Sequence, residues 1–152
     1  MVIYQIKESM QKRITINDCT IVSLPTFTDN RGSLSLIDSE VTAQRLPFKP
    51  ERVFWIYGTN PDTVRGQHAH RSCWEMVCAV SGSFSLTLSD GTQEKTFLLD
   101  SPNKGVIIPP MVWCRLHDFA PGTVCLALAS DDYDAEGYIN DFEQFQNDTS
   151  ND

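Results

Sequence analysis

The sequence predicts an all-β domain of the sandwich or barrel type with one short helix at its C-terminal end. Short apolar or alternating runs indicate the strands, and they cover residues 13–24, 32–38, 52–58, 75–82, 83–90, 94–100, 105–110 and 123–130. Clusters of Gly, Pro, Asn, Asp and Ser separate these runs at short intervals. Many short strands at such spacing are typical of a β-sandwich or barrel. Only residues 138–146 have helical character.

The elements follow in order from their local patterns. Residues 2–6 alternate between apolar and polar types and predict an N-terminal strand. Residues 83–88 alternate most cleanly, and their apolar face is made by Phe84, Leu86 and Leu88. Motifs such as TDNRG at 28–32 and SPNKG at 101–105 predict turns between strands. We expect a short helix over 138–146 and a frayed polar tail over 147–152.

Composition indicates one soluble domain. The chain has 152 residues, of which 41% are hydrophobic and 21% charged, and this length suffices for a single core over residues 1–152. No apolar run approaches the roughly 20 residues that span a bilayer, and the N-terminus lacks the apolar centre of a signal peptide. These features predict a cytoplasmic protein. The five cysteines form no CxxC pair and indicate reduced, buried thiols.

The net charge of -8 disfavours two classes of partner. A chain this acidic repels nucleic acid and anionic membranes, so we expect neither as a partner. A small phosphorylated ligand is compatible with this charge if arginines gather at one site.

The stretch VRGQHAHRSCWE, from Val64 to Glu75, concentrates the residues that carry chemistry. His68 and His70 are two of the chain's three histidines and lie between two arginines. On a strand they would project to the same face, with Cα atoms about 7 Å apart, and Gly66 would leave room beside them. Such a pair can transfer protons or bind a metal. The alternative is two solvated histidines on an exposed strand.

This stretch resembles the first motif of the cupin family, in which a glutamate and then a glycine follow HxH. The matching residues are His68, His70, Glu75 and Gly82. Residues 105–114 resemble the second motif, with Cys114 where cupins carry a third histidine. The resemblance implies the cupin double-stranded β-helix, or jelly roll. Two imidazoles and a carboxylate can bind iron or zinc, so a metal-dependent cupin enzyme that uses His68, His70 and Glu75 stays an alternative.

A longer resemblance covers about Cys19 to Phe145. The chain is similar to the dTDP-4-dehydro-6-deoxyglucose 3,4-ketoisomerases, WxcM-like cupins of deoxysugar biosynthesis. The stretches that carry it are DNRGSLSLID, LPFKPERVFWIYG, RGQHAH, VSGSFSLTLSDG, LDSPNKGVIIPPMVW, DFAPGTVCLALASDDYD and YINDFEQF. It implies that the carbonyl of dTDP-4-keto-6-deoxyglucose moves from C4 to C3 through an enediol, without metal or other cofactor. Amination of the product would lead to an amino-deoxysugar for lipopolysaccharide or O-antigen.

The same resemblance implies catalytic roles. His70 is the base that removes the C3 proton, and His68 orients the substrate or relays the proton to C4. Tyr57 supplies a hydroxyl near the sugar oxygens, and Arg65 stabilises enediolate or phosphate charge. These residue types suit the reaction, which needs a base with a pKa near neutrality and fixed positive charge at the developing oxyanion.

Further residues are expected to bind the substrate. They are Arg31, Glu75, Trp113 and Arg115. Arg31 would reach the nucleotide from a neighbouring strand or subunit, Trp113 would stack on the sugar or base, and Glu75 would hydrogen-bond the histidine pair. The family resemblance also implies a homodimer that exchanges N-terminal strands, with Val2–Ile6 as such a strand. A non-catalytic cupin that binds a sugar nucleotide is the remaining alternative.

Overall fold

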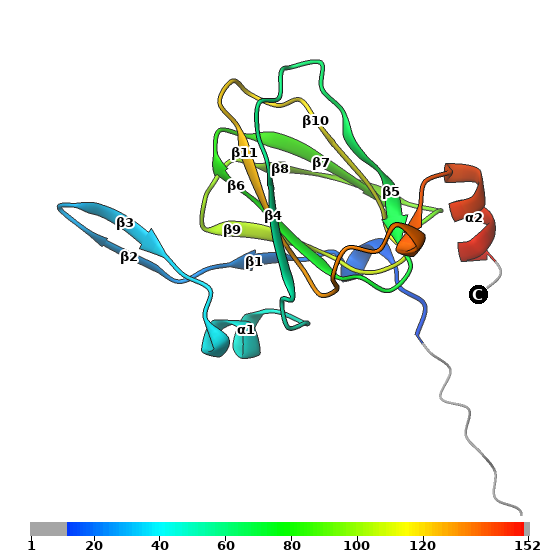
Figure 1. Cartoon of the computed structure of the whole chain (residues 1–152), viewed down its shortest axis with the longest axis horizontal. Helices are drawn as coiled ribbons and strands as arrows, with labels where there is room; N and C mark the ends of the chain where they lie inside the picture. The colour runs from blue at the N-terminus through cyan, green and yellow to red at the C-terminus, as the bar shows by residue number, and fades with distance from the viewer. Residues whose placement is uncertain (1–11, 151–152) are drawn as a thin grey trace, which may run out of the picture.

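The computed structural model describes residues 12–150 and is built from two five-stranded antiparallel sheets and one separate hairpin (Figure 1). The first sheet has the order β1 (Ile21–Ser23), β9 (Lys104–Ile108), β6 (Glu75–Ser81), β11 (Val124–Ala129) and β4 (Arg52–Ile56). The second has the order β12 (Tyr138–Ile139), β5 (Arg65–His70), β10 (Trp113–His117), β7 (Phe84–Ser89) and β8 (Glu94–Leu99). This antiparallel β architecture confirms the predicted cupin jelly roll.

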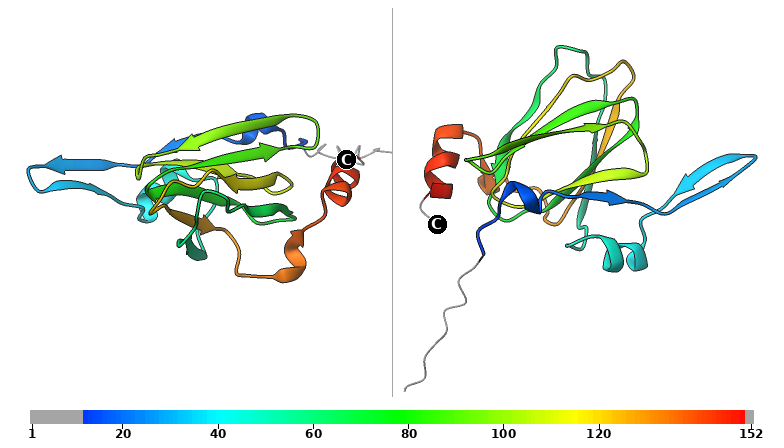
Figure 2. Two further views of the ribbon diagram at one scale, coloured as in Figure 1. Left: turned by 90° about the horizontal axis from the view of Figure 1, so that it is seen from above. Right: turned by 180° about the vertical axis from the view of Figure 1, so that it is seen from behind.

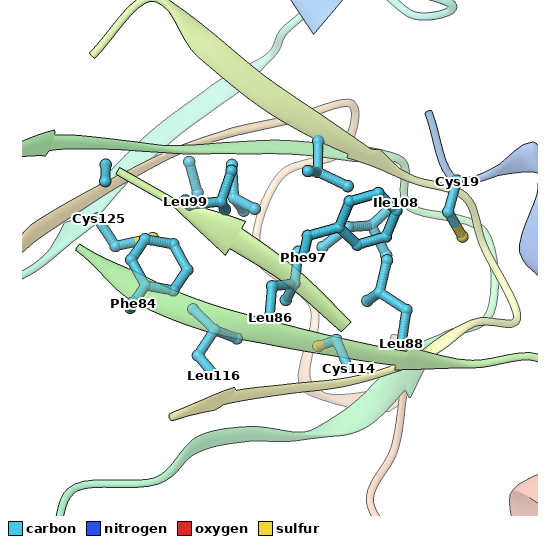
Figure 3. Packing of buried hydrophobic residues seen from close by; sticks show 14 of the residues in the cluster. Cys19, Phe84, Leu86, Leu88, Phe97, Leu99, Ile108, Cys114, Leu116 and Cys125 are labelled. Carbon is cyan, nitrogen blue, oxygen red and sulfur yellow. The ribbon is translucent and has the colours of Figure 1, made fainter. Parts of the chain in front are cut away.

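The core lies between the inner faces of the two sheets (Figure 3). The apolar face predicted for 83–88 is confirmed, because Phe84, Leu86 and Leu88 are each 0% exposed. All five cysteines are buried and free, as the sequence predicted. The inner faces of the two sheets therefore pack an apolar core.

The helices differ from the prediction in several places, one of them a 3-10 helix at Ile16–Asp18 within the predicted strand 13–24. An additional helix, α1 (Ser39–Arg45), follows the hairpin, and it was missed because its pattern is short. The carboxylate of Asp38 accepts a hydrogen bond from the Val41 backbone N–H at 2.9 Å and so caps this helix. Near the C-terminus, residues 138–139 form a strand, and the helix α2 (Phe142–Ser150) begins later than expected.

Helix α2 also replaces most of the predicted frayed tail. It begins after Asp141, whose carboxylate accepts a hydrogen bond from the Gln144 backbone N–H at 2.8 Å. It continues to Ser150 because Phe145 and Thr149 are buried on its inner face. Tertiary contacts of these two side chains stabilise a segment that its polar composition alone does not.

The hairpin of β2 (Thr26–Asp29) and β3 (Gly32–Ser35) projects away from the two sheets in every view (Figures 1 and 2). All of its strand residues are exposed, including the large side chains of Phe27 and Leu34. The predicted exchange strand Val2–Ile6 lies outside the described residues. No helix among the described residues has the length and apolar character that crossing a membrane requires.

The turn between β6 and β7 depends on Gly82. Its φ is +70°, and a Cβ there would lie 2.7 Å from the Cα of Thr123. We expect Gly82→Ala to lower the free energy of unfolding by about 3 kcal/mol, because left-handed strain adds to a backbone clash. Urea denaturation measures this loss.

Gly58 provides a matched control for this substitution. Its φ is +68°, but a Cβ at this position would meet nothing within 4 Å. Gly58→Ala should therefore lose only about 1 kcal/mol, the contribution of backbone strain alone. Equal losses in the two variants would show that the contact with Thr123 is unimportant.

Candidate functional site

A cavity of about 640 Å³ lies between the inner faces of the two sheets. Its walls come from β4, β5, β6, β9, β10 and β11, together with residues between Tyr133 and Asn140. Most of the inner wall is apolar, and the polar groups that face it include Arg52, Arg65, His68 and His70. An apolar cavity with a few convergent polar groups is the usual form of a small-molecule site.

The histidine pair lies in this cavity, as the strand pattern predicted. The ring centroids of His68 and His70 are 4.9 Å apart, with the rings nearly perpendicular. His70 Nε2 lies 2.6 Å from Glu75 Oε1, and both side chains are 6% exposed. This nitrogen is itself buried. The carboxylate beside it can orient the ring and stabilise the imidazolium that would form on proton transfer.

The backbone of β5 explains how the pair is positioned. His68 lies opposite Cys114 on β10, and His70 lies opposite Tyr138 on β12. Gly66 has a φ of +82°, and a Cβ there would lie 2.9 Å from the carbonyl oxygen of Cys114. Only glycine fits this approach, since any side chain would push β10 away. The glycine thus keeps β5 and β10 close and aims both histidines inward.

Burial sets the protonation state of two cavity residues. Loss of water around His68 lowers the pKa of its imidazole, and repulsion from His70 lowers it further. Burial raises the pKa of Tyr138, although Arg52 acts on its hydroxyl in the opposite direction. At neutral pH the site therefore contains a neutral imidazole at His68 and a protonated phenol at Tyr138.

The structure brings half of the predicted site residues together. His68, His70, Arg65 and Glu75 line the cavity. Tyr57 does not line it. Phe54 and Ile56 of β4 do, and Tyr57, which directly follows this strand, is 70% exposed. Strand alternation explains these positions.

The other three predicted residues also lie outside the cavity lining. Trp113 packs on α2, with ring centroids 5.2 Å from Phe142 and 5.7 Å from Phe145. Arg115 alternates with the inward residues of β10 and so faces away. Arg31 lies at the tip of the hairpin and forms an ion pair with Asp29.

Sequence reasoning did not place Tyr138 and Arg52 in the cavity. The Tyr138 ring lies 4.4 Å from that of His70 and 4.9 Å from that of His68. The Arg52 guanidinium lies over the rings of Phe54 and Tyr133. Their positions depend on which strands pair, and no spacing in the sequence reports that pairing.

A metal could be held by the same group of residues. The potential ligand atoms of His68, His70 and Glu75 lie within 4.8 Å of one another. Two imidazoles and a carboxylate fit the facial donor set of divalent iron. Cys114 is not a ready fourth ligand, since burial and the Glu75 charge raise the pKa of its thiol. The donor set thus fits a metal bound by three protein ligands.

Fold and site together define a cupin-type barrel with a histidine pair in its cavity. The family model described as WxcM-like, C-terminal (FdtA) matches residues 17–150. The chain belongs to this family.

The chain is similar over most of its length to several named proteins. A TDP-4-oxo-6-deoxy-α-D-glucose-3,4-oxoisomerase of Aneurinibacillus thermoaerophilus is 34% identical over 126 residues, which are 83% of this chain and 88% of the relative. The crystal structure of a 3,4-ketoisomerase from Helicobacter canadensis is 34% identical with a TM-score of 0.82, covering 88% of this chain and 98% of that one. A mutant of the 3,4-ketoisomerase QdtA from Thermoanaerobacterium thermosaccharolyticum, in complex with TDP-4-keto-6-deoxyglucose, is 28% identical with a TM-score of 0.83, covering 88% and 95%.

Proposed function

We propose that this protein is a sugar nucleotide 3,4-ketoisomerase that converts dTDP-4-keto-6-deoxyglucose to a dTDP-3-keto-6-deoxyhexose. The observation that carries the proposal is the pair of His68 and His70 in the cavity, with His70 Nε2 2.6 Å from the Glu75 carboxylate. The relatives, named as TDP-sugar 3,4-ketoisomerases or oxoisomerases, support the same reaction. The reaction shifts a carbonyl within one molecule, so it consumes no redox equivalent.

The geometry supports a role for each of these groups in the proposed reaction. His70 removes the proton from C3, and the neighbouring Glu75 carboxylate stabilises the resulting imidazolium. The electron pair of the C3–H bond becomes the C3–C4 double bond of the enediol. A proton is then delivered to C4. His68 lies in the same cavity beside His70 and serves as the relay or orienting group. Arg65 supplies positive charge at the cavity for phosphate or enediolate oxygens.

The proposal extends to assembly and location. A homodimer would cover the exposed Phe27 and Leu34 of the hairpin and bring Arg31 toward the nucleotide of the partner subunit. Trp113 and Arg115 lie outside the cavity lining. They would bind the substrate only if the substrate extends beyond this cavity. A cytoplasmic location suits five free thiols. We further propose that the product is aminated at C3 for lipopolysaccharide or O-antigen.

A metal-dependent cupin enzyme is the second candidate, because His68, His70 and Glu75 form a compact donor set. A divalent metal held by these residues would polarise a substrate carbonyl as a Lewis acid. In that case the two histidines would bind the ion rather than transfer protons. The two candidates differ in their response to a chelator.

The test is NMR of dTDP-4-keto-6-deoxyglucose incubated with the protein in deuterated buffer, with and without chelator. We expect a 3-keto product with deuterium at C4, formed at the same rate in both samples. Loss of turnover with chelator would support the metal-dependent enzyme. Exchange at C3 and C5 would indicate 3,5-epimerisation, and binding without any exchange would indicate a non-catalytic sugar-nucleotide binder.

A further inference from the structure

We propose that Tyr138 is a catalytic acid and base of this enzyme, which moves the hydroxyl proton between the two sugar oxygens while histidine moves the carbon-bound proton. Arg52 holds and stabilises the phenol oxygen for this purpose. The inference rests on the proposed ketoisomerase function and assigns a group that the reaction requires. Proton transfer at carbon alone cannot complete a ketoisomerisation, because the oxygen at C4 must gain a proton and the oxygen at C3 must lose one.

The position of Tyr138 follows from the pairing of β12 with β5. Tyr138 lies opposite His70 in the register of these two strands. Its ring centroid is 4.4 Å from that of His70 and 4.9 Å from that of His68, so all three rings form one cluster in the cavity. A sugar carbon within reach of either imidazole therefore places its oxygen substituent near the phenol.

Arg52 lines the same cavity from a strand of the other sheet. It begins β4, and its guanidinium carbon lies 5.3 Å from the centroid of the Phe54 ring and 5.9 Å from that of Tyr133. Its Nε is buried and has no hydrogen-bond partner among the described residues. A guanidinium cannot act as the proton donor itself, since it stays protonated in proteins. It can stabilise a tyrosinate that forms beside it.

The protonation state of Tyr138 suits this role. A tyrosine phenol is ordinarily protonated at neutral pH, so the hydroxyl can donate its proton. The Arg52 guanidinium lines the same cavity and carries the positive charge that would stabilise a tyrosinate.

The proton balance of the reaction closes with these groups. His70 takes the C3 proton, the C–H electron pair becomes the C3–C4 double bond, and the carbonyl electron pair moves onto the C4 oxygen. Tyr138 gives its proton to that oxygen and becomes tyrosinate. In the second half the tyrosinate takes the proton of the C3 hydroxyl, C3 becomes the carbonyl, and C4 receives a proton from the histidine pair. Tyr138 and the histidines return to their starting states.

Tyr57 is the competing assignment for this hydroxyl. It carries the same functional group, but it is 70% exposed and lies outside the residues that line the cavity. A phenol in water cannot protonate an oxygen held beside His68 and His70. The geometry thus favours Tyr138.

The test compares Tyr138→Phe with Tyr57→Phe. Phenylalanine keeps the ring against the two imidazoles and removes only the hydroxyl. We expect Tyr138→Phe to lower kcat for isomerisation by about 10²-fold, with KM for dTDP-4-keto-6-deoxyglucose changed less than threefold. The loss should exceed that of Tyr57→Phe at least tenfold. The melting temperature and the affinity for dTDP, measured on the same samples, report whether the fold and the nucleotide site are intact.

The outcomes separate this inference from the proposed function. If the wild-type protein is active and the kcat of Tyr138→Phe lies within threefold of the wild-type value, the role of Tyr138 is overturned and the ketoisomerase proposal stands. A larger loss in Tyr57→Phe than in Tyr138→Phe would transfer the role to Tyr57. Absence of ketoisomerase activity in the wild-type protein would overturn the proposed function itself and the inference with it.

Discussion

His70→Asn lowers kcat for isomerisation by about 10³-fold and abolishes deuterium exchange at C3, if the cavity histidine is the base. Removal of a general base typically slows a reaction by about 10²–10⁴-fold. Asparagine is close to histidine in size and polarity but cannot take a proton. The substitution also leaves Glu75 without the imidazole that lies 2.6 Å from its carboxylate. The measurement is the same NMR experiment in deuterated buffer, with dTDP affinity as a check that the site still binds nucleotide.

Two further variants give this prediction its controls. His117→Asn removes the third histidine, which lies on β10 outside the cavity and contacts the Thr87 hydroxyl at 2.7 Å, and it should leave kcat within threefold. His68→Asn should keep exchange at C3 but lose product, because the proton would leave C3 without delivery to C4. Retention of more than a tenth of wild-type activity in His70→Asn would contradict the assignment of the base.

Local patterns predicted the parts of the site that one strand determines. His68 and His70 share a face because side chains two residues apart on a strand point the same way, and both line the cavity. The alternation of residues 83–88 likewise identified the buried face of β7. In both cases the information lies within six residues of sequence. The family resemblance then supplied the chemistry that the pattern leaves open.

Residues that reach the cavity through strand pairing could not be predicted in this way. Tyr138 meets His70 through a strand of two residues, Tyr138–Ile139, at the edge of the second sheet. Arg52 enters from β4 of the first sheet. Tyr57, assigned on resemblance, follows the last residue of β4 and is 70% exposed in this chain. Facing direction is a local property, whereas proximity across the barrel depends on register and sheet order.

Raising the pH from 8 to 10 should remove roughly 5 kcal/mol of the free energy of unfolding through four buried thiols. Burial raises the pKa of Cys78 from 9.0 to about 11 and that of Cys19 to about 12. It also raises the pKa of the Cys114 and Cys125 thiols. Above pH 9 the unfolded chain loses these protons while the folded chain keeps them. The folded state then binds more protons, so its stability is complete below pH 9 and falls as the pH rises.

Urea denaturation at pH 8 and pH 10 measures this loss, and Cys78→Ala assigns it. Each thiol contributes about 1.4 kcal/mol over this interval, so the variant should show a pH-dependent loss smaller by that amount. Val106→Ala is the matched control, since Val106 is equally buried and has no proton to lose. It should lower stability at both pH values by the same amount through the cavity that it leaves. Ionisation of tyrosines and lysines contributes equally to the pH dependence of the wild-type protein and of both variants. An unchanged pH dependence in Cys78→Ala would therefore show that this thiol does not contribute.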